Sequence, residues 1–571
     1  MARNIPIGVD DFSELVNPEN NFLFVDKSLM IKELIDKGVK VSLIIRPRRW
    51  GKTLNMSMIQ HFFAPEVNGS STKGVFDNLK ISSVDNASYL SFQGQNPVIF
   101  ITLKNIKPDS WELFLEKIME LIANLYREHA RTLLGSERLL EYDKNFYKTI
   151  LERKCNQSQL ENSLKTLSEY LFYHYNQKVI ILIDEYDSPL NATYGNECFE
   201  RIVNFLKVMF GAALKGNYAL EKGIMTGILR LSKNRMLSDI NNLKLYSFME
   251  ERYSTCFGFF EDEVKSLFKE SGLDINMKEV QRWYNGYNSG NLESVYNPWS
   301  ILNCIDDKGK LKPYWIKTGD ETLLKDIFLK SNDQIREKVG ILLSGGSIQS
   351  EIGEYLSFDQ IKEGDNDVLW SLLWALGYLK IVGEIKQFGS RYQCQLKIPN
   401  EEIETNYRDI FLSLIESMNR PRYYYSFIKN LALGNVAAFV KDLEEFMLVN
   451  TSFFDFTHES HYHVMLLTWI ASLKETHSIH SNQEHGLGKP DIILIPREVT
   501  NDLGIILELK RTEINQNAKV YEKLAEEGLA QINEKKYDAT FRQIPHIKRI
   551  LKVAFLFYGK QFICKTVLES I

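Results

Sequence analysis

The sequence lacks the features that would place it in a membrane or in an oxidising compartment. No apolar run approaches the roughly 18 residues of a membrane-spanning helix, and the first residues, MARNIPIGVDDF, do not form the apolar core of a signal peptide. The six cysteines are far apart and include no C-x-x-C pair, so the sequence predicts neither a zinc site nor a disulfide framework. We therefore expect a soluble, cytoplasmic protein without a membrane partner.

The sequence also lacks low-complexity tracts and a dominant charge. With 44% hydrophobic and 25% charged residues it has the composition of an ordinary folded protein, and 571 residues are too many for one hydrophobic core. We therefore expect several domains. A net charge of −5 argues against a protein that coats nucleic acid nonspecifically, although a local basic surface is compatible with it.

A phosphate-binding loop is indicated near the amino terminus. The run VSLII predicts a strand, RPRRWGKT (Arg46 to Thr53) predicts a loop, and LNMSMIQHFF has apolar residues at helical spacing. In this order, loop amides and a helix N-terminus converge on phosphates. Lys52 would reach the β- and γ-phosphates, the Thr53 hydroxyl would bind Mg²⁺, and Gly51 would let the backbone approach. Arg46 stands where the common motif has glycine, which leaves a basic turn as the alternative.

An acidic motif and a third apolar run favour the nucleotide site. KVIILIDEYDSPL predicts a strand buried on both faces that ends in Asp184 and Glu185. In a Walker B motif, Asp184 would hold Mg²⁺ through water, and Glu185 would orient and activate the attacking water. The run GIMTGILRLS places Thr226 and Arg230 where P-loop ATPases carry γ-phosphate sensors. Structural caps are an equal alternative for these last two residues.

A second constellation lies near the carboxyl terminus. GKPDIILIPREVTNDLGIILELKR predicts two strands joined by a polar loop. Asp491 opens the first strand, and Glu508 and Lys510 lie on one face of the second because strand side chains alternate. Two carboxylates can bind a hard divalent cation while a lysine stabilises charge that develops on a phosphate. A charged edge hairpin without chemistry is the alternative.

The middle of the chain is less explicit. VLWSLLWALGYLKI predicts a helix that enters a strand, and a hairpin is predicted about Gly389. A helix followed by a hairpin suggests a winged-helix-like lid, in which Trp370, Leu372 and Trp374 would be core residues. After Pro399, apolar residues recur at helical spacing, which predicts a helical connector.

Taken together, these motifs resemble a bacterial family that joins an AAA-ATPase-like domain to a C-terminal PD-(D/E)XK nuclease-like domain. The resemblance covers nearly the whole chain and also rests on IPIGVDDFSEL, FVDKSLMIKELI, MTGILRLSKNRMLSDINNL, CFGFFEDEV, WYNGY and VYNPWSIL. The loop of that family reads RPRR-aromatic-GK-[ST]. The resemblance therefore implies that Arg46 belongs to the motif and that the loop binds ATP.

The resemblance implies further residues at the nuclease-like site. Glu459 stands where such enzymes often place an additional acidic metal ligand on their first core helix, and Tyr462 and His463 follow it. A packed structural role is the commoner one for a histidine such as His463. A segment similar to the second core helix, where such nucleases contact DNA or support the metal, carries Gln531, Lys535 and Tyr537. A phosphate-contacting face, or else a solvated helix face, is suggested for Lys548, Arg549 and Lys552.

We therefore predict a multidomain α/β protein. Its expected parts are a parallel-sheet, AAA-like P-loop ATPase domain (1–300), a helical, winged-helix-like lid (301–400), a helical connector (401–450) and a PD-(D/E)XK nuclease-like α/β domain (451–571). The expected nucleotide-binding residues are Arg49, Trp50, Gly51, Lys52, Thr53, Leu54, Asp184, Thr226 and Arg230. The expected catalytic residues are Glu185, Asp491, Glu508 and Lys510, and the expected metal ligands are Thr53, Asp184, Glu459, Asp491 and Glu508.

The expected function is ATP hydrolysis that regulates a metal-dependent nuclease acting on DNA. The cofactors would be ATP and Mg²⁺, with Mn²⁺ as an alternative at the nuclease site, and nucleic acid would be the partner, DNA before RNA. The alternative is an ATP-driven switch whose nuclease-like domain binds nucleic acid or a partner without cleavage. The sequence leaves a homo-oligomer open.

Overall fold

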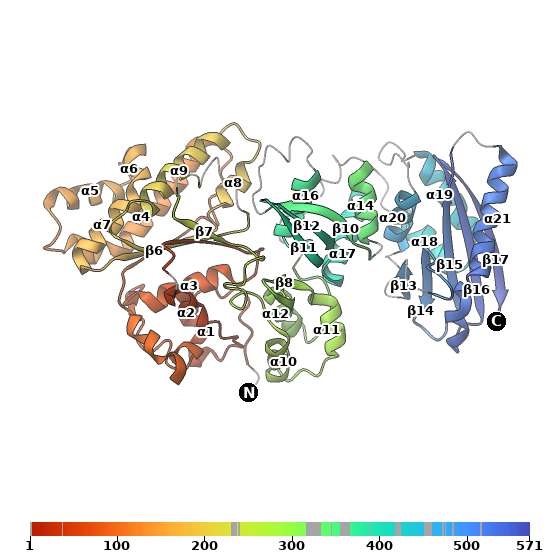
Figure 1. The fold of residues 1–571 in the computed structure, drawn as a ribbon, viewed down its shortest axis with the longest axis horizontal. Coiled ribbons are helices and arrows are strands. Elements are labelled where there is room, and N and C mark those ends of the chain that lie inside the picture. Colours follow the sequence, from red (N-terminus) through yellow and green to blue (C-terminus); the bar gives the residue numbers. More distant parts are fainter. Residues whose placement is uncertain are drawn as a thin grey trace. The chain divides into compact units, whose positions relative to one another are not determined.

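The chain folds into two compact units (Figure 1). The first contains Met1–Trp315, Ser350–Cys394 and Pro399–Glu401, and the second contains Ile316–Gln349, Gln395–Ile398 and Glu402–Ile571. The computed structural model describes residues 3–36, 38–229, 237, 240–315, 333–343, 345–353, 366–389, 391–416, 424–449, 459–470, 473, 476–481, 485–513 and 517–571. Within these ranges no helix has the length and apolar character needed to cross a membrane.

A five-stranded parallel sheet forms the centre of the first unit. The order is β4-β5-β6-β1-β7, with β1 (Val41–Ile45), β4 (Val98–Thr102), β5 (Val179–Asp184), β6 (Leu220–Gly227) and β7 (Leu243–Tyr246). Every residue of β1 and β5 is buried, which explains their largely apolar sequences. The strands therefore end in a shared edge, where the predicted loop and acidic pair lie.

Helices cover both faces of this sheet (Figure 1). One face carries α1 (Phe12–Val16), α2 (Leu29–Asp36) and α3 (Lys52–Phe63), and the other carries α4 (Trp111–Leu134), α7 (Ser163–Tyr175) and α9 (Phe199–Leu214). Between α4 and α7 lie α5 (Glu141–Leu151) and α6 (Gln157–Glu161), and α8 (Ser188–Thr193) follows β5. The short strands β2 (Glu66–Val67) and β3 (Ser70–Ser71) pair after α3.

A smaller helical core follows the sheet. It is formed by α10 (Glu261–Glu270), α11 (Met277–Tyr284) and α12 (Pro298–Asp306). Between α11 and α12 in the chain lies the hairpin of β8 (Tyr287–Ser289) and β9 (Leu292–Val295). Buried Val264, Phe268, Tyr284 and Ile301 pack together there.

The helix followed by a hairpin in the middle of the chain is confirmed. α16 (Asn366–Ala375) leads into β11 (Lys380–Phe388), and β12 (Arg391–Lys397) pairs with both β11 and β10 (Ile348–Gly353). Trp370, Leu372 and Trp374 are buried, as predicted for core residues. The relationship to a winged helix stays a prediction.

The second unit contains a mixed sheet in the order β13-β14-β15-β16-β17. The strands are β13 (His477–Ser481), β14 (Ile492–Pro496), β15 (Leu503–Arg511), β16 (Arg549–Tyr558) and β17 (Gln561–Ser570), and only β15 and β16 pair in parallel. Both faces of the sheet are covered by helices (Figure 1): α18 (Tyr424–Ala432), α19 (Val436–Val449) and α20 (Glu459–Ile470) on one, α21 (Ala518–Glu534) on the other. The unit also contains α14 (Asp333–Leu343) and α17 (Glu401–Glu416).

The described part of the segment predicted as a connector contains α17, α18 and α19. Ile428 and Leu431 of α18 and Phe439 and Leu443 of α19 belong to the same hydrophobic core as the C-terminal sheet. These two helices therefore support the second unit directly. The domain bounds given by the sequence stay a prediction.

Candidate functional site

The loop between β1 and α3 is held by a buried arginine. Arg46 is 0% exposed, and its guanidinium donates to the carbonyl oxygens of Ile45 (2.7 Å) and Tyr246 (3.1 Å). The same group lies 5.0 Å from the ring centres of Phe248 and Phe257. Burial lowers the pKa of Arg46 to about 10, so the side chain stays charged at neutral pH. Arg46 therefore stabilises the loop from the buried side, where its guanidinium is out of reach of a phosphate.

Trp50 is a second buried support of the loop. Its side chain is 1% exposed and meets the rings of Phe248 and Tyr287 edge to face, with centroids 5.1 and 5.0 Å away. A nucleotide contact at Trp50 would therefore come from its backbone. Arg49 and Gly51 both adopt positive φ angles of 64° and 77°, a region that glycine enters without strain.

Lys52 and Thr53 begin α3 and lie beside the end of β5. The Lys52 ammonium is buried and donates to the carbonyl oxygens of Pro47 (2.8 Å) and Arg46 (3.0 Å). Burial lowers the pKa of Lys52, and the carboxylates of Glu185 and Asp184 oppose that change. Thr53 Oγ1 donates to Asp184 Oδ2 at 2.7 Å. The structure thus brings Lys52, Thr53 and Asp184 together, as the sequence predicts. Half-buried Leu54 follows in the first turn of α3.

Asp184 accepts hydrogen bonds from three threonine hydroxyls. This fully buried carboxylate is contacted by Thr53, by Thr226 and, at 3.4 Å, by Thr102. Thr226 lies inside β6, one residue before its end, so it reaches Asp184 from the neighbouring strand. Thr102 was not singled out from the sequence. Only the strand register, which pairs it with Asp184, reveals this contact, and no sequence motif records that register. Arg230 lies outside the described residues.

Glu185 and Asp187 follow β5 and have different surroundings. Glu185 has a φ of 51° and is partly exposed, and partial burial together with Asp184 and Asp187 raises its pKa, while Lys52 opposes the rise. Asp187 is 1% exposed, and its Oδ2 accepts from the amides of Ile228 (3.0 Å) and Leu229 (2.9 Å). Asp187 therefore anchors Ile228 and Leu229 directly after β6, a role that the sequence did not reveal.

The acidic residues of the second unit lie on one face of a hairpin. Ile492 of β14 is opposite Leu507 of antiparallel β15, so the next pair outward is Asp491 and Glu508. Directly opposite residues of antiparallel strands point to the same face. Lys510 Nζ lies 3.2 Å from Glu508 Oε1. The structure thus brings the three side chains together, as strand alternation predicts.

Glu508 combines burial with incomplete hydrogen bonding. It is 2% exposed, and Lys510 and the Gln531 side-chain amide donate to its Oε1, whereas Oε2 has no hydrogen-bond partner among the described residues. Burial raises the pKa of Glu508 to about 7, and the negative charge of Asp491 adds to this rise. Burial also raises the pKa of Asp491 to about 6, against the effect of the Leu509 amide, which donates to Oδ2 at 2.7 Å. A bound cation would stabilise both carboxylates in their charged form.

Glu459 begins α20 and lies near this pair. Although its side chain as a whole is exposed, loss of solvent around the carboxyl and the charge of Asp491 raise its pKa, and the Arg511 amide donates to it. In the described ranges, no three His, Cys, Asp or Glu side chains are close enough to form a metal cluster. The structure therefore shows a carboxylate pair with a nearby third acid, and the role of Glu459 as a ligand stays a prediction.

Several predicted neighbours support the pair. His463 is 4% exposed, and its Nε2 lies 3.1 Å from the Asp491 carbonyl oxygen, while burial lowers its pKa. This is the structural role expected for a packed histidine. Tyr462 donates to the Gly559 carbonyl oxygen at 2.8 Å and stacks on Phe557. These hydrogen bonds join the two side chains to backbone carbonyl oxygens and not to the carboxyl groups of Asp491 and Glu508.

The end of α21 supplies a further support. Gln531 donates to Glu508 and lies 3.4 Å from the Tyr537 hydroxyl, which donates to the Lys489 carbonyl oxygen at 3.3 Å. Gln531 and Tyr537 thus connect Glu508 with the segment that precedes Asp491. Lys535, at the C-cap of α21, is exposed.

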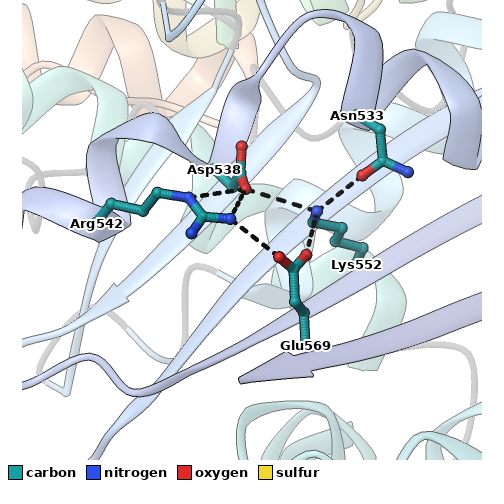
Figure 2. Close-up of polar contacts among 5 residues, drawn as sticks. All are labelled: Asn533, Asp538, Arg542, Lys552 and Glu569. Atoms are coloured by element: carbon teal, nitrogen blue, oxygen red, sulfur yellow. Dashed lines mark hydrogen bonds and ion pairs between the residues drawn. The ribbon is translucent and has the colours of Figure 1, made fainter. Parts of the chain in front are cut away.

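The predicted basic helix face at residues 548–552 is wrong. The segment enters β16, and Lys552 is 4% exposed inside an ion network with Asn533, Asp538 and Glu569 (Figure 2). Its ammonium lies 2.6 Å from Glu569 Oε2 and 2.8 Å from Asn533 Oδ1. Arg549 pairs with Asp502 at 2.7 Å, and Lys548 is exposed. Lys552 and Arg549 are therefore neutralised by carboxylates.

Comparison with known proteins agrees with the two constellations. Residues 6–237 match a family model described as predicted AAA-ATPase, and residues 457–567 match the PD-(D/E)XK nuclease superfamily. The chain joins an AAA-ATPase-like domain to a PD-(D/E)XK nuclease-like domain. The ATPase-like match includes the loop, Asp184 and Thr226, and the nuclease-like match includes Asp491 and Glu508.

A curated relative covers much of the same length. It is described as "Uncharacterized protein in vnfD 5'region" of Azotobacter chroococcum mcd 1, and it is 24% identical over 412 residues. The similarity spans 72% of this chain and 70% of the relative. It therefore extends beyond either domain alone.

Proposed function

We propose that the ATPase-like domain binds and hydrolyses ATP and thereby regulates cleavage of DNA by the nuclease-like domain. The observation that carries the proposal is the Asp491 and Glu508 pair, in which a buried carboxylate beside a lysine has one oxygen without a hydrogen-bond partner in the part of the chain that the structure describes. In a structural ion pair the charged atoms have hydrogen-bond partners, as those around Lys552 do. A buried carboxylate oxygen that lacks such a partner therefore favours a cation site.

The residues of the nucleotide site suit this proposal. Lys52 is buried near Asp184 and Glu185, whose charges oppose the effect of burial on its pKa, and a triphosphate would interact favourably with its ammonium group. Thr53 and Asp184 would hold Mg²⁺, which neutralises phosphate charge when bound. Glu185, whose raised pKa makes it a better proton acceptor, would orient and deprotonate the attacking water. Thr226 and Thr102 fix the Asp184 carboxylate.

The residues of the second site have separate tasks in the proposal. Asp491 and Glu508, with Glu459 as a further candidate, would hold Mg²⁺ or Mn²⁺, which supplies positive charge at the scissile phosphate when bound. Lys510 would stabilise the extra negative charge of the transition state. Gln531 would orient Glu508 through its amide.

A binding module without cleavage is the second candidate. The observation that favours it is the lack, within the described ranges, of three clustered metal-ligating side chains. In that case nucleic acid or a partner would bind to the nuclease-like domain, and nucleotide would control the affinity. The two candidates differ in whether a phosphodiester bond is broken.

The test is an assay of the purified full chain on labelled duplex DNA, single-stranded DNA and RNA. Each substrate is incubated with Mg²⁺, Mn²⁺ or EDTA, and with ATP, ADP or no nucleotide. We expect metal-dependent cleavage of DNA whose rate changes with the nucleotide. Nucleotide-dependent binding with no cleavage in any metal would support the binding module, and cleavage of RNA alone would change the substrate.

The raised pKa values predict a pH dependence of metal-free stability. Asp491 and Glu508 have higher pKa values in the folded chain (about 6 and about 7) than their ordinary values of 3.8 and 4.5. Between the ordinary and the raised pKa values, the folded state therefore binds more protons than the unfolded state. The free energy of unfolding should therefore fall as pH rises from about 4 to about 7. Thermal unfolding in EDTA should show this slope, and Glu508→Gln should flatten it. An unchanged slope in the variant would contradict the prediction.

A further inference from the structure

A group of lysines lies at the amino-terminal edge of the parallel sheet, opposite to the edge that carries the nucleotide site. Lys40 immediately precedes β1, Lys178 immediately precedes β5, Lys222 is the third residue of β6, and Lys244 is the second residue of β7. Because the strands are parallel, their first residues gather at one edge. These four residues are named the lysine edge. Ligands of open α/β sheets usually bind at the other edge, so the proposed ATP site leaves this one unexplained.

The strand register places Lys40 next to Lys222, with Lys244 and Lys178 a few positions away at the same edge. Val41 is opposite Gly223, so the preceding residues Lys40 and Lys222 are neighbours, and Lys244 is opposite Ser42. Burial lowers the pKa of Lys40 and Glu221 opposes this effect, while repulsion from Lys178 adds to it.

Positive charge accumulates further around Lys222. The pKa of Lys222 is lowered mainly by burial. The negative charge of Glu221 opposes this decrease, and repulsion from Arg252 and Lys40 adds to it. Arg252 donates to the Tyr246 hydroxyl at 3.0 Å, and Lys244 Nζ lies 5.4 Å from the centre of the same ring. Arg252 therefore extends the lysine edge toward the end of β7.

Carboxylates do not neutralise this surface as they do Lys552. Among the described residues, none of the four lysines forms a direct ion pair, and Lys40 instead donates to the Leu220 carbonyl oxygen at 2.5 Å. Glu221 acts on Lys40 and Lys222 from a greater distance. Charges of one sign held together in this way raise the local potential, and a polyanion would relieve their repulsion.

Two exposed tyrosines lie near Lys178, at one end of the lysine edge. Tyr173 and Tyr218 are 44% and 49% exposed, and their hydroxyls are 2.6 Å apart. The carbonyl oxygen of Ala219, next to Tyr218, accepts from the Val179 amide at 2.8 Å, which places Tyr218 near Lys178. Aromatic rings next to a basic surface suit the stacking of unpaired bases.

We propose that the lysine edge, with Tyr173 and Tyr218, binds single-stranded nucleic acid through its phosphates and bases. This inference deepens the proposed function. It rests on that function in one respect, the choice of nucleic acid as the polyanion. The exposed rings favour single strands over duplexes, because bases in a duplex already stack on one another. The surface would hold a strand independently of the carboxylate pair at the nuclease-like site.

The test compares two variants of the full chain that lose the same charge. One carries Lys40→Gln, Lys178→Gln, Lys222→Gln and Lys244→Gln. The control carries Lys73→Gln, Lys154→Gln, Lys265→Gln and Lys269→Gln, which replace exposed lysines of the same unit outside this edge. Fluorescence anisotropy with labelled oligothymidylate, over a range of KCl concentrations in EDTA and without nucleotide, measures binding separately from cleavage and hydrolysis.

We expect the edge variant to lose about tenfold or more in affinity at low salt. The slope of log affinity against log salt should become less steep by up to about 0.7 for each lysine that contacts a phosphate. The control variant should change neither quantity. Tyr218→Leu should weaken single-strand binding by about tenfold and affect a duplex of equal length less.

Other outcomes would overturn the proposal. Equal losses in both lysine variants would show a general charge effect, and unchanged binding in the edge variant would exclude the surface. If the edge variant lost binding to phosphatidylserine vesicles and kept oligothymidylate binding, the partner would be a membrane. A chain that neither hydrolyses ATP nor cleaves DNA, but shows the expected salt result, would refute the proposed function and leave this inference standing.

Discussion

Asp491→Asn and Glu508→Gln should each reduce DNA cleavage by more than about 100-fold, because each removes a charged oxygen from the proposed cation site. Neither change should unfold the protein. Glu508 is buried and its ionisation is already unfavourable, so a neutral glutamine of the same shape should keep or raise the melting temperature in EDTA. Cleavage rates and thermal unfolding of the same preparations check both statements.

The matched control is Glu498→Gln in the loop between the two strands. Glu498 is exposed and belongs to the same hairpin, so its replacement changes the net charge equally and should leave cleavage unchanged. DNA affinity measured in EDTA separates cleavage from binding. If Asp491→Asn kept full cleavage, or if it lost DNA binding and cleavage in parallel, the assignment of a cation site to this pair would be wrong.

Lys510 offers a finer distinction within the same site. Its ammonium lies beside Glu508, and the side chain is 33% exposed, so it can reach a bound phosphate. Lys510→Met should lower kcat more than it raises KM, because the lost charge matters most in the transition state. A change confined to KM would instead indicate a lysine that only attracts DNA.

Local patterns were sufficient to predict the framework of both sites. The strand, loop and helix around Lys52 and the hairpin of Asp491 and Glu508 depend on residues close together in sequence, and periodicity records such elements directly. The same alternation that predicted Glu508 and Lys510 on one face holds in the structure. The chemistry of these positions stays a prediction until activity is measured.

What could not be predicted depends on partners that are distant in sequence. Thr102 contacts Asp184 only because β4 lies next to β5, and no local motif records strand order. Arg46 stands where the common motif has glycine, and its sequence context does not show that its side chain is buried against residues about 200 positions later, such as Tyr246. Lys552 looked available to DNA because the sequence could not show that Glu569 neutralises it.

Lys52→Met should reduce ATP hydrolysis by about 100-fold or more, since it removes the ammonium that contacts the loop and interacts with the carboxylates of Asp184 and Glu185. ATP affinity should fall as well, because the charge would contact phosphates in the ground state too. The structure adds a cost in stability. Lys52 is buried and satisfies the carbonyl oxygens of Arg46 and Pro47, so its loss leaves polar groups unpaired.

Glu185→Gln separates binding from hydrolysis at the same site. Glu185 makes no described hydrogen bond to the loop, and a glutamine keeps its shape, so ATP affinity and the melting temperature should stay near those of the unaltered chain. Turnover should nevertheless fall by about 100-fold or more, because the amide cannot accept the proton of the attacking water.

Exposed Glu197 supplies the control as Glu197→Gln. Bound nucleotide and phosphate release, measured for all three variants, decide the matter. Hydrolysis that persists in both Lys52→Met and Glu185→Gln would remove the ATPase from the proposed function, whereas lost hydrolysis with retained ATP in Glu185→Gln alone would place the water-activating group at this carboxylate.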